Sequence, residues 1–132
     1  MKEREMEIEN VIKNLKPESI TAERKKTLQP LIDFIQSKTT NHQEIRLNLI
    51  CTHNSRRSMF GQIWAKVASR YFGFENVETY SGGTEVTEFN NNAVQSLSDI
   101  GFDLKVEGKK ENPVYHLIFD NLDNASICFS KL

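Results

Sequence analysis

Cysteine and proline are scarce in this sequence, and long apolar runs are missing from it. Its 132 residues include two cysteines, Cys51 and Cys128, and three prolines. Two cysteines cannot build the multiple-disulfide framework of a small secreted domain. The sequence also lacks the run of about 18 apolar residues that a membrane-spanning helix needs, and the pattern of a secretory signal peptide. We therefore expect a protein of the reducing cytoplasm.

A strong excess of charge of either sign is missing as well. The 17 Lys and Arg residues nearly balance the 18 Asp and Glu residues, which gives a net charge of -1. Such a surface has no general attraction for nucleic acid or for an anionic membrane, so neither is expected as a partner. With 38% hydrophobic and 27% charged residues, the composition is that of a globular protein, and the length fits one core.

The chemistry is concentrated in a stretch with the pattern of a strand, a tight loop and a helix. Apolar Ile45, Leu47 and Leu49 alternate with polar residues, which predicts a strand that ends near Cys51. From residue 60 onward the apolar spacing is that of one helical face, whose members are Phe60, Ile63, Trp64, Val67, Ala68 and Tyr71. Gly73 follows at the position of a helix C-cap glycine.

The loop between this strand and helix has the residues of an oxyanion site beside a thiolate. The first N–H groups of a helix lack intrahelical partners and, together with the helix dipole, attract anions. That field lowers the pKa of a cysteine that faces the helix N-terminus, which is Cys51 here. Arg57 can bridge two oxygens of a tetrahedral anion, and Ser58 can donate a hydrogen bond to the sulfur. Asn54 tolerates the left-handed backbone that so tight a loop requires.

Residues Cys51–Ser58 resemble the active-site loop of the low-molecular-weight protein tyrosine phosphatases and the related thioredoxin-coupled arsenate reductases. Two further stretches, residues 63–65 and residues 80–85 with 90–94, are more similar to the arsenate-reductase branch. The similarity covers about residues 45–104. It implies an α/β fold of three layers, the phosphotyrosine phosphatase I-like parallel sheet, which residues 45–132 would form only in part.

The resemblance also implies roles for individual residues. Cys51 would be the nucleophile, Arg57 the anion-binding arginine and Ser58 the residue that stabilises the sulfur. Ser81, at the end of the next strand, would support the loop. The remaining anion-binding and loop-shaping positions are Thr52, His53, Asn54, Ser55 and Arg56. No metal or cofactor is expected, because the thiolate itself attacks phosphorus or arsenic.

Two positions in the loop depart from the family pattern. His53 stands where the family usually has glycine; it either supplies a proton or favours the thiolate, or else it points to solvent. Arg56 stands where many members have a second cysteine. That change removes a thiol that can protect the nucleophile as a disulfide, and it adds positive charge that favours anions.

By the same resemblance, the later parts of the family's sequence are missing. The family's general acid is an aspartate in an Asp-Pro pair, and no such pair occurs here. Asp120 and Asp123 are candidates to replace it, although both also fit a turn that bonds to its own backbone. The reductases carry two further redox cysteines, whereas Cys128 has apolar neighbours that favour a buried, inert thiol over a resolving one. We therefore expect a truncated chain or one part of a split protein.

Residues 1–44 precede the region of similarity and are predicted to be a helical extension. A first helix should end before Pro17, and a second should begin after Thr21 as its N-cap, with a kink or a new start at Pro30. The two apolar stripes are Ile8, Val11, Ile12 and Leu15, then Leu28, Leu31, Ile32 and Ile35. Residues 38–44 are expected to be a polar linker. The extension is either a helical layer that covers the domain or forms an oligomer contact, or a regulatory or partner-binding arm.

The sequence after the central helix predicts a second, parallel strand at 77–81 and a β-rich C-terminal region. Gly82 and Gly83 permit a close turn beside the loop. A helix is expected over 92–100, then a charged loop over 106–112 and a hairpin of 114–119 with 125–129, joined by the turn 120–124. Thr84, Glu85 and Thr87 line either the mouth of the site or an ordinary surface loop.

Three functions fit this sequence. The first is a cysteine-dependent phosphatase that acts on a phosphomonoester, phosphotyrosine in a protein included, through a cysteinyl-phosphate. The second is an arsenate reductase that uses thioredoxin or another external thiol donor. The third is an oxyanion-binding protein that holds phosphate or arsenate without efficient turnover. Because two parallel strands and a hairpin bury little core, we also expect a homo-oligomer or a complementing chain.

Overall fold

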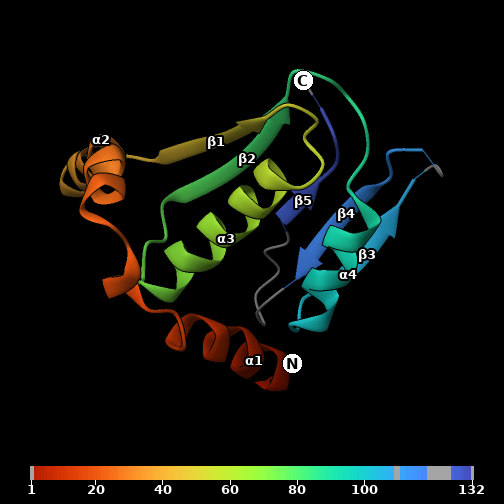
Figure 1. Cartoon of the computed structure of the whole chain (residues 1–132), viewed down its shortest axis with the longest axis horizontal. Coiled ribbons are helices and arrows are strands. Elements are labelled where there is room, and N and C mark those ends of the chain that lie inside the picture. Colours follow the sequence, from red (N-terminus) through yellow and green to blue (C-terminus); the bar gives the residue numbers. More distant parts are fainter. Residues whose placement is uncertain (1, 109–110, 119–125, 132) are drawn as a thin grey trace.

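The computed structural model describes residues 2–108, 111–118 and 126–131. Helices come first and strands dominate the end of the chain (Figure 1). The helices are α1 (Lys2–Lys13), α2 (Ala22–Thr40), α3 (Arg57–Tyr71) and α4 (Asn91–Asp99), with a single 3-10 turn at Pro17–Ser19. The strands are β1 (Ile45–Cys51), β2 (Val77–Gly83), β3 (Asp103–Glu107), β4 (Val114–Ile118) and β5 (Ser126–Cys128). The protein is therefore of the α/β class.

Strands β1 and β2 form the small parallel sheet that the sequence predicts, with α3 as the crossover between them. Their register pairs Ile45 with Val77 at one end and Cys51 with Gly83 at the other. Strand β2 continues through both glycines, so Gly82 and Gly83 extend the strand and do not form the predicted turn. Since parallel strands end at the same edge, Cys51 lies beside Gly83 at the edge where ligands bind in such sheets.

Helix α3 begins and ends where the sequence predicts. It begins at Arg57 and its C-cap is Phe72. Gly73 has a φ of 81° and donates to the carbonyl of Arg70 at 3.1 Å, and Phe74 donates to Ser69 at 2.7 Å. This pair of bonds is a Schellman motif, which needs a residue in the left-handed region at the glycine position.

The buried face of α3 differs from the predicted one. Met59, Ile63 and Val67 are buried, and Phe60 and Trp64 pack against them at the edge of the core. The predicted members Ala68 and Tyr71 are exposed, because the last turn extends past the core, where the Tyr71 ring packs edge-on against the ring of Phe72. The C-terminal strands pack against the face of α3 that carries Met59, Ile63 and Val67. This packing explains why the buried face differs from the predicted one.

The C-terminal strands form an antiparallel sheet in the order β3-β4-β5. The predicted β4–β5 hairpin is confirmed by the pairing of Tyr115 with Cys128, while its turn and both candidate acids, Asp120 and Asp123, lie outside the described residues. The predicted charged loop is wrong over its first residues, because Val106 and Glu107 belong to β3. Strand β3 is an edge strand, and polar, exposed residues on such a strand hide its alternation.

The main core joins α3 to this antiparallel sheet and to α4. Asn90 caps α4 with its side-chain oxygen, and Ala93 and Leu97 are the buried residues on the inner face of the helix. Figure 1 shows α1 along the lower side of the molecule, and Ile8 is its buried contribution. Among the residues that the structure describes, the buried members of this core are Ile8, Met59, Ile63, Val67, Phe89, Ala93, Leu97, Phe102, Tyr115, Leu117 and Cys128.

Helix α2 departs from the predicted pattern in two ways. Thr21 is its N-cap as predicted and accepts from the backbone of Arg24 at 3.1 Å, and the helix runs without interruption through Pro30 to Thr40. The predicted linker is therefore wrong at residues 38–40. None of the residues of α2, all of which the structure describes, is buried, and Leu31 and Ile32 are 42% and 51% exposed.

In the described part of the chain, every helix is too short or too polar to cross a membrane.

Removing a core side chain from the antiparallel sheet should destabilise the protein strongly. Leu117 is fully buried in β4, so Leu117→Ala should lower the free energy of unfolding by about 2–5 kcal/mol. Urea denaturation measures this loss. The matched variant Val106→Ala, in the neighbouring strand at 61% exposure, should change the free energy by less than about 0.5 kcal/mol. Equal effects of the two variants would contradict this account of the core.

Candidate active site

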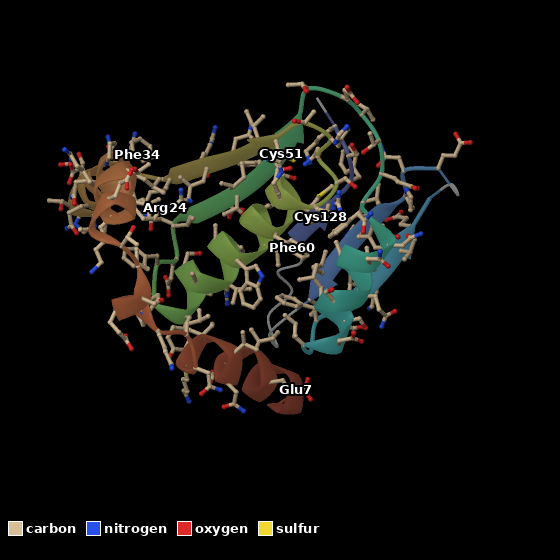
Figure 2. The ribbon with its side chains drawn as sticks, in the orientation of Figure 1. Glu7, Arg24, Phe34, Cys51, Phe60 and Cys128 are labelled. Atoms are coloured by element: carbon tan, nitrogen blue, oxygen red, sulfur yellow. The ribbon has the colours of Figure 1, made fainter. Side chains whose placement is uncertain are left out.

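The loop between β1 and α3 curls around the sulfur of Cys51. Strand β1 ends at Cys51 and α3 begins at Arg57, so five residues make the connection. Figure 2 shows Cys51 where the strand gives way to this loop, above the first turn of α3. Asn54 has a φ of 46°, which is the left-handed conformation that the sequence predicts for this residue. Arg56 is the N-cap of α3, and its side chain does not cap the helix.

The surroundings of Cys51 favour the thiolate. Burial alone would raise the pKa of the Cys51 thiol. Hydrogen bonds from the Ser58 hydroxyl and from the backbone of Ser58, Asn54 and Ser55 outweigh burial and lower this pKa from 9.0 to about 7. The lowering follows from donors that are already oriented by the loop and stabilise only the charged form. Cys51 is therefore ionised to a larger extent at neutral pH than an ordinary cysteine.

A chain of hydrogen bonds orients the Ser58 hydroxyl toward the sulfur. Asn54 and Ser58 are both buried, and the Asn54 amide Nδ2 donates to Ser58 Oγ at 2.7 Å. Cys51 Sγ lies 3.0 Å from the same Oγ. Because Asn54 Nδ2 can only donate, Ser58 Oγ accepts from it and keeps its own hydrogen for the sulfur. The backbone N–H of Lys131 donates to Asn54 Oδ1 at 2.9 Å and so fixes which way the amide faces.

A pocket of about 570 Å³ opens over the loop. Its lining consists of Cys51, His53, Ser55, Arg56, Arg57, Thr87, Glu88, Asn90, Asn91 and Asn92. Arg56 and Arg57 are both exposed, and no carboxylate of the described residues pairs with either guanidinium. Two unpaired cations, the N-terminus of α3 and a thiol therefore share one pocket. Such a pocket can bind a tetrahedral anion next to the sulfur.

Strand β2 and the segment after it support the backbone of the loop. Thr52 O accepts from the backbone N–H groups of Thr84 and Glu85, at 2.9 and 3.0 Å, and from the Thr84 hydroxyl at 3.1 Å. A Cβ atom on Gly83 would lie 2.8 Å from both Asn54 N and Thr52 O. The glycine is therefore required by close approach of the strand to the loop, and not by a turn.

Ser81 lies in β2, the strand that follows the loop and α3, and its described side-chain contacts are with α3. It is buried, and its hydroxyl donates to Gln62 Oε1 at 2.7 Å and lies 3.6 Å from the sulfur of Met59. Both partners belong to α3. The described contacts of its hydroxyl therefore fasten β2 to the central helix, and they reach the loop only through that helix.

A segment close to the end of the described chain holds the loop from the other side. Ser130 is 1% exposed, and its Oγ donates to His53 O at 3.0 Å and accepts from Thr87 N at 2.7 Å. The Asn112 side chain clamps the backbone N and O of Ser130, both at 2.8 Å. Ser130 and Asn112, and the wall formed by Glu88 and residues 90–92, were not predicted as site residues, whereas Thr87 was a candidate for the mouth of the site and does line the pocket. Since 77 positions separate Ser130 from His53, no local pattern could have signalled the contact.

The second cysteine has the inert environment that the sequence predicts. Cys128 is fully buried in β5, and burial raises the pKa of its thiol to about 12. Figure 2 labels both cysteines, on separate elements of the fold. The structure describes no cluster of three or more His, Cys, Asp or Glu side chains that could hold a metal ion.

Removing the Ser58 hydroxyl should make Cys51 less acidic. In Ser58→Ala the sulfur loses its side-chain donor, so the pKa of Cys51 should rise by about one unit. The pH dependence of alkylation by iodoacetamide measures this shift. Ser69→Ala, which removes a hydroxyl in the last turns of the same helix, is the control and should leave the midpoint near 7. An unchanged midpoint in Ser58→Ala would show that the backbone donors alone set the pKa.

Comparisons of the chain with protein-family models, with curated proteins and with solved structures give no significant match. The geometry of this pocket and the chemistry of its residues are therefore the basis for assigning a function.

Proposed function

We propose that the protein is a cysteine-dependent phosphatase of the low-molecular-weight protein tyrosine phosphatase type. The observation that carries the proposal is the Cys51 sulfur, which receives hydrogen bonds from Ser58 and the loop backbone at the N-terminus of α3. Arg56 and Arg57 lie over the same pocket. A thiolate, convergent N–H donors and cations together are what attack on a phosphate dianion requires.

The proposed reaction proceeds in two steps through Cys51. The thiolate attacks phosphorus, an S–P bond forms and the P–O bond to the alcohol breaks. Water then attacks the cysteinyl-phosphate and releases inorganic phosphate and the thiolate. During both steps Arg57 and the backbone N–H groups of the loop stabilise the charge on the equatorial oxygens. Because these roles of Cys51, Arg57 and the loop are those of that phosphatase family, we assign the β1-α3-β2 unit to the phosphotyrosine phosphatase I-like fold as part of the proposal.

Arsenate is an alternative substrate for the same loop, but its reduction needs further thiols. Cys128 is the one other thiol among the described residues, and it is fully buried with a raised pKa. A reductase with these residues would depend on external thiols for every turnover. Hydrolysis needs only water, so the geometry supports the phosphatase better.

Replacing the nucleophile should abolish turnover. We expect the protein to hydrolyse p-nitrophenyl phosphate, whose leaving group departs with little help from an acid, and Cys51→Ser to reduce the rate to background. Ser69→Ala, in the last turn of α3 and therefore at the opposite end of the helix from the loop, should keep the wild-type rate. Release of p-nitrophenolate at pH 7 measures both.

Two results would count against the phosphatase. Turnover that survives in Cys51→Ser would exclude the thiolate mechanism. Absence of turnover in the wild type, with vanadate or arsenate still bound, would leave an oxyanion-binding protein.

A further inference from the structure

The proposed reaction needs a proton at the leaving oxygen, and few groups in the pocket can give one. When the P–O bond breaks, the departing oxygen carries a negative charge, which a general acid neutralises. Arginine stays protonated, and the amide and hydroxyl groups of the lining donate hydrogen bonds without releasing a proton. Among the described lining residues other than Cys51, His53 and Glu88 are the groups that exchange protons.

We propose that His53 is the general acid of this site and that Glu85 is its positioning residue; this inference rests on the proposed phosphatase function. His53 Nε2 lies 3.5 Å from Glu85 Oε2, at the rim of the pocket that holds Cys51. The carboxylate lies beside one ring nitrogen and favours the orientation in which that nitrogen faces it. The other nitrogen, Nδ1, is left to hand its proton to the leaving oxygen.

The backbone of His53 is fixed, although its side chain is exposed. Its carbonyl accepts from Thr87 Oγ1 at 2.7 Å and from Ser130 Oγ at 3.0 Å. Ser130 is itself almost fully buried, so these hydroxyls belong to the framework of the protein. The Cα atom of His53 is therefore held in place, two residues after the nucleophile. A residue that only faces solvent would not require a backbone held in this way.

The two steps balance with His53 as the only proton carrier. In the first, Cys51 Sγ bonds to phosphorus, the P–O bond breaks, and the leaving oxygen takes the proton of the imidazolium. In the second, the neutral imidazole takes a proton from the water that attacks phosphorus. The S–P bond breaks with its electrons on sulfur, and the thiolate and the imidazolium are restored.

Leaving-group dependence tests this role, because an acid matters most when the leaving group is poor. His53→Gln should lower kcat/KM for phenyl phosphate about 100-fold, and for p-nitrophenyl phosphate less than about fivefold. Glu85→Gln should also lower kcat/KM for both substrates, and its loss on phenyl phosphate should be smaller than that of His53→Gln. The matched control is the second His–Glu pair, His116 and Glu107 at 2.9 Å across β3 and β4, where His116→Gln should change neither rate.

The outcomes separate this proposal from the function on which it rests. Equal losses on both substrates in His53→Gln, or the leaving-group signature in Glu88→Gln and not in His53→Gln, would overturn the role of His53 while the phosphatase stands. Lack of any Cys51-dependent hydrolysis of p-nitrophenyl phosphate would overturn both. Alkylation of Cys51 with its midpoint still near pH 7 shows that the loop of each variant is intact.

Discussion

Iodoacetamide at pH 7 should alkylate Cys51 and leave Cys128 unmodified. With pKa values of about 7 and about 12, the thiolate fractions are about one half and about 10⁻⁵. The less basic thiolate is intrinsically less reactive, which offsets about 10² of this ratio over five pKa units. A preference of about 10³ remains, and the complete burial of Cys128 increases it further. Peptide mapping by mass spectrometry identifies the modified residue.

The pH dependence of this alkylation gives the pKa of Cys51 directly. The rate should rise through pH 7 and level off above about pH 8, and phosphate or vanadate should slow it by occupying the pocket. In Cys51→Ser, the remaining thiol should react only after unfolding in guanidinium chloride. A midpoint near 9, or equal labelling of both cysteines in the folded protein, would contradict the arrangement of the loop.

The same two pKa shifts act on stability with opposite signs. Folding lowers the pKa of Cys51, so its contribution is fully present above the unfolded value of 9.0 and is lost as the pH falls through about 7. Folding raises the pKa of Cys128, so its contribution is fully present below pH 9.0 and is lost as the pH rises from there toward about 12.

Gly83→Ala should damage both the stability of the protein and the geometry of the site. The new Cβ would lie 2.8 Å from Asn54 N and from Thr52 O, which are backbone atoms and cannot swing aside. The loop would have to move away from β2, at a cost of about 2–3 kcal/mol in the free energy of unfolding. Displacement of the donors around Cys51 should also raise its pKa and reduce turnover by about 10². Urea denaturation, alkylation and the phosphatase assay measure the three effects.

Gly73→Ala is the control for backbone strain without loss of the site. Gly73 has a φ of 81°, and no atom lies within 4 Å of an added Cβ, so alanine there is strained but not crowded. It should cost about 1 kcal/mol and leave the pKa of Cys51 and the turnover unchanged. If Gly83→Ala resembled this control, the contact between β2 and the loop would not determine the site.

The local parts of the fold could be predicted from the sequence because their determinants lie within a few residues. Alternation predicts β1, the Cys51-to-Ser58 spacing predicts the loop, and Gly73 marks the end of α3. The left-handed conformation of Asn54 is confirmed for the same reason, since short polar side chains tolerate it. The cap of α2 at Thr21 is a further local signal that the structure confirms.

Tertiary contacts decided the features that the sequence did not predict. The buried face of α3 is set by the antiparallel sheet packed against it, and the edge strand β3 carries no clean alternation. Ser81 bonds to Gln62 because the two elements are packed together, which a family resemblance alone does not specify. The hydrogen bond from Ser130 to His53 joins residues that are 77 positions apart in the sequence, so it depends on how the whole chain between them folds.

The clamp of Asn112 on Ser130, and the contacts of Ser130 and Lys131 with the loop, determine when the site can form during folding. The bonds of the β1-loop-α3 unit are local, whereas the oxygen of its Asn54 amide is held by the backbone N–H of Lys131, 77 positions away. Closing so long a loop of chain is slow relative to forming a helix. Full orientation of the Ser58 hydroxyl, and its share in the acidity of Cys51, therefore require the last described segment to be docked against the loop.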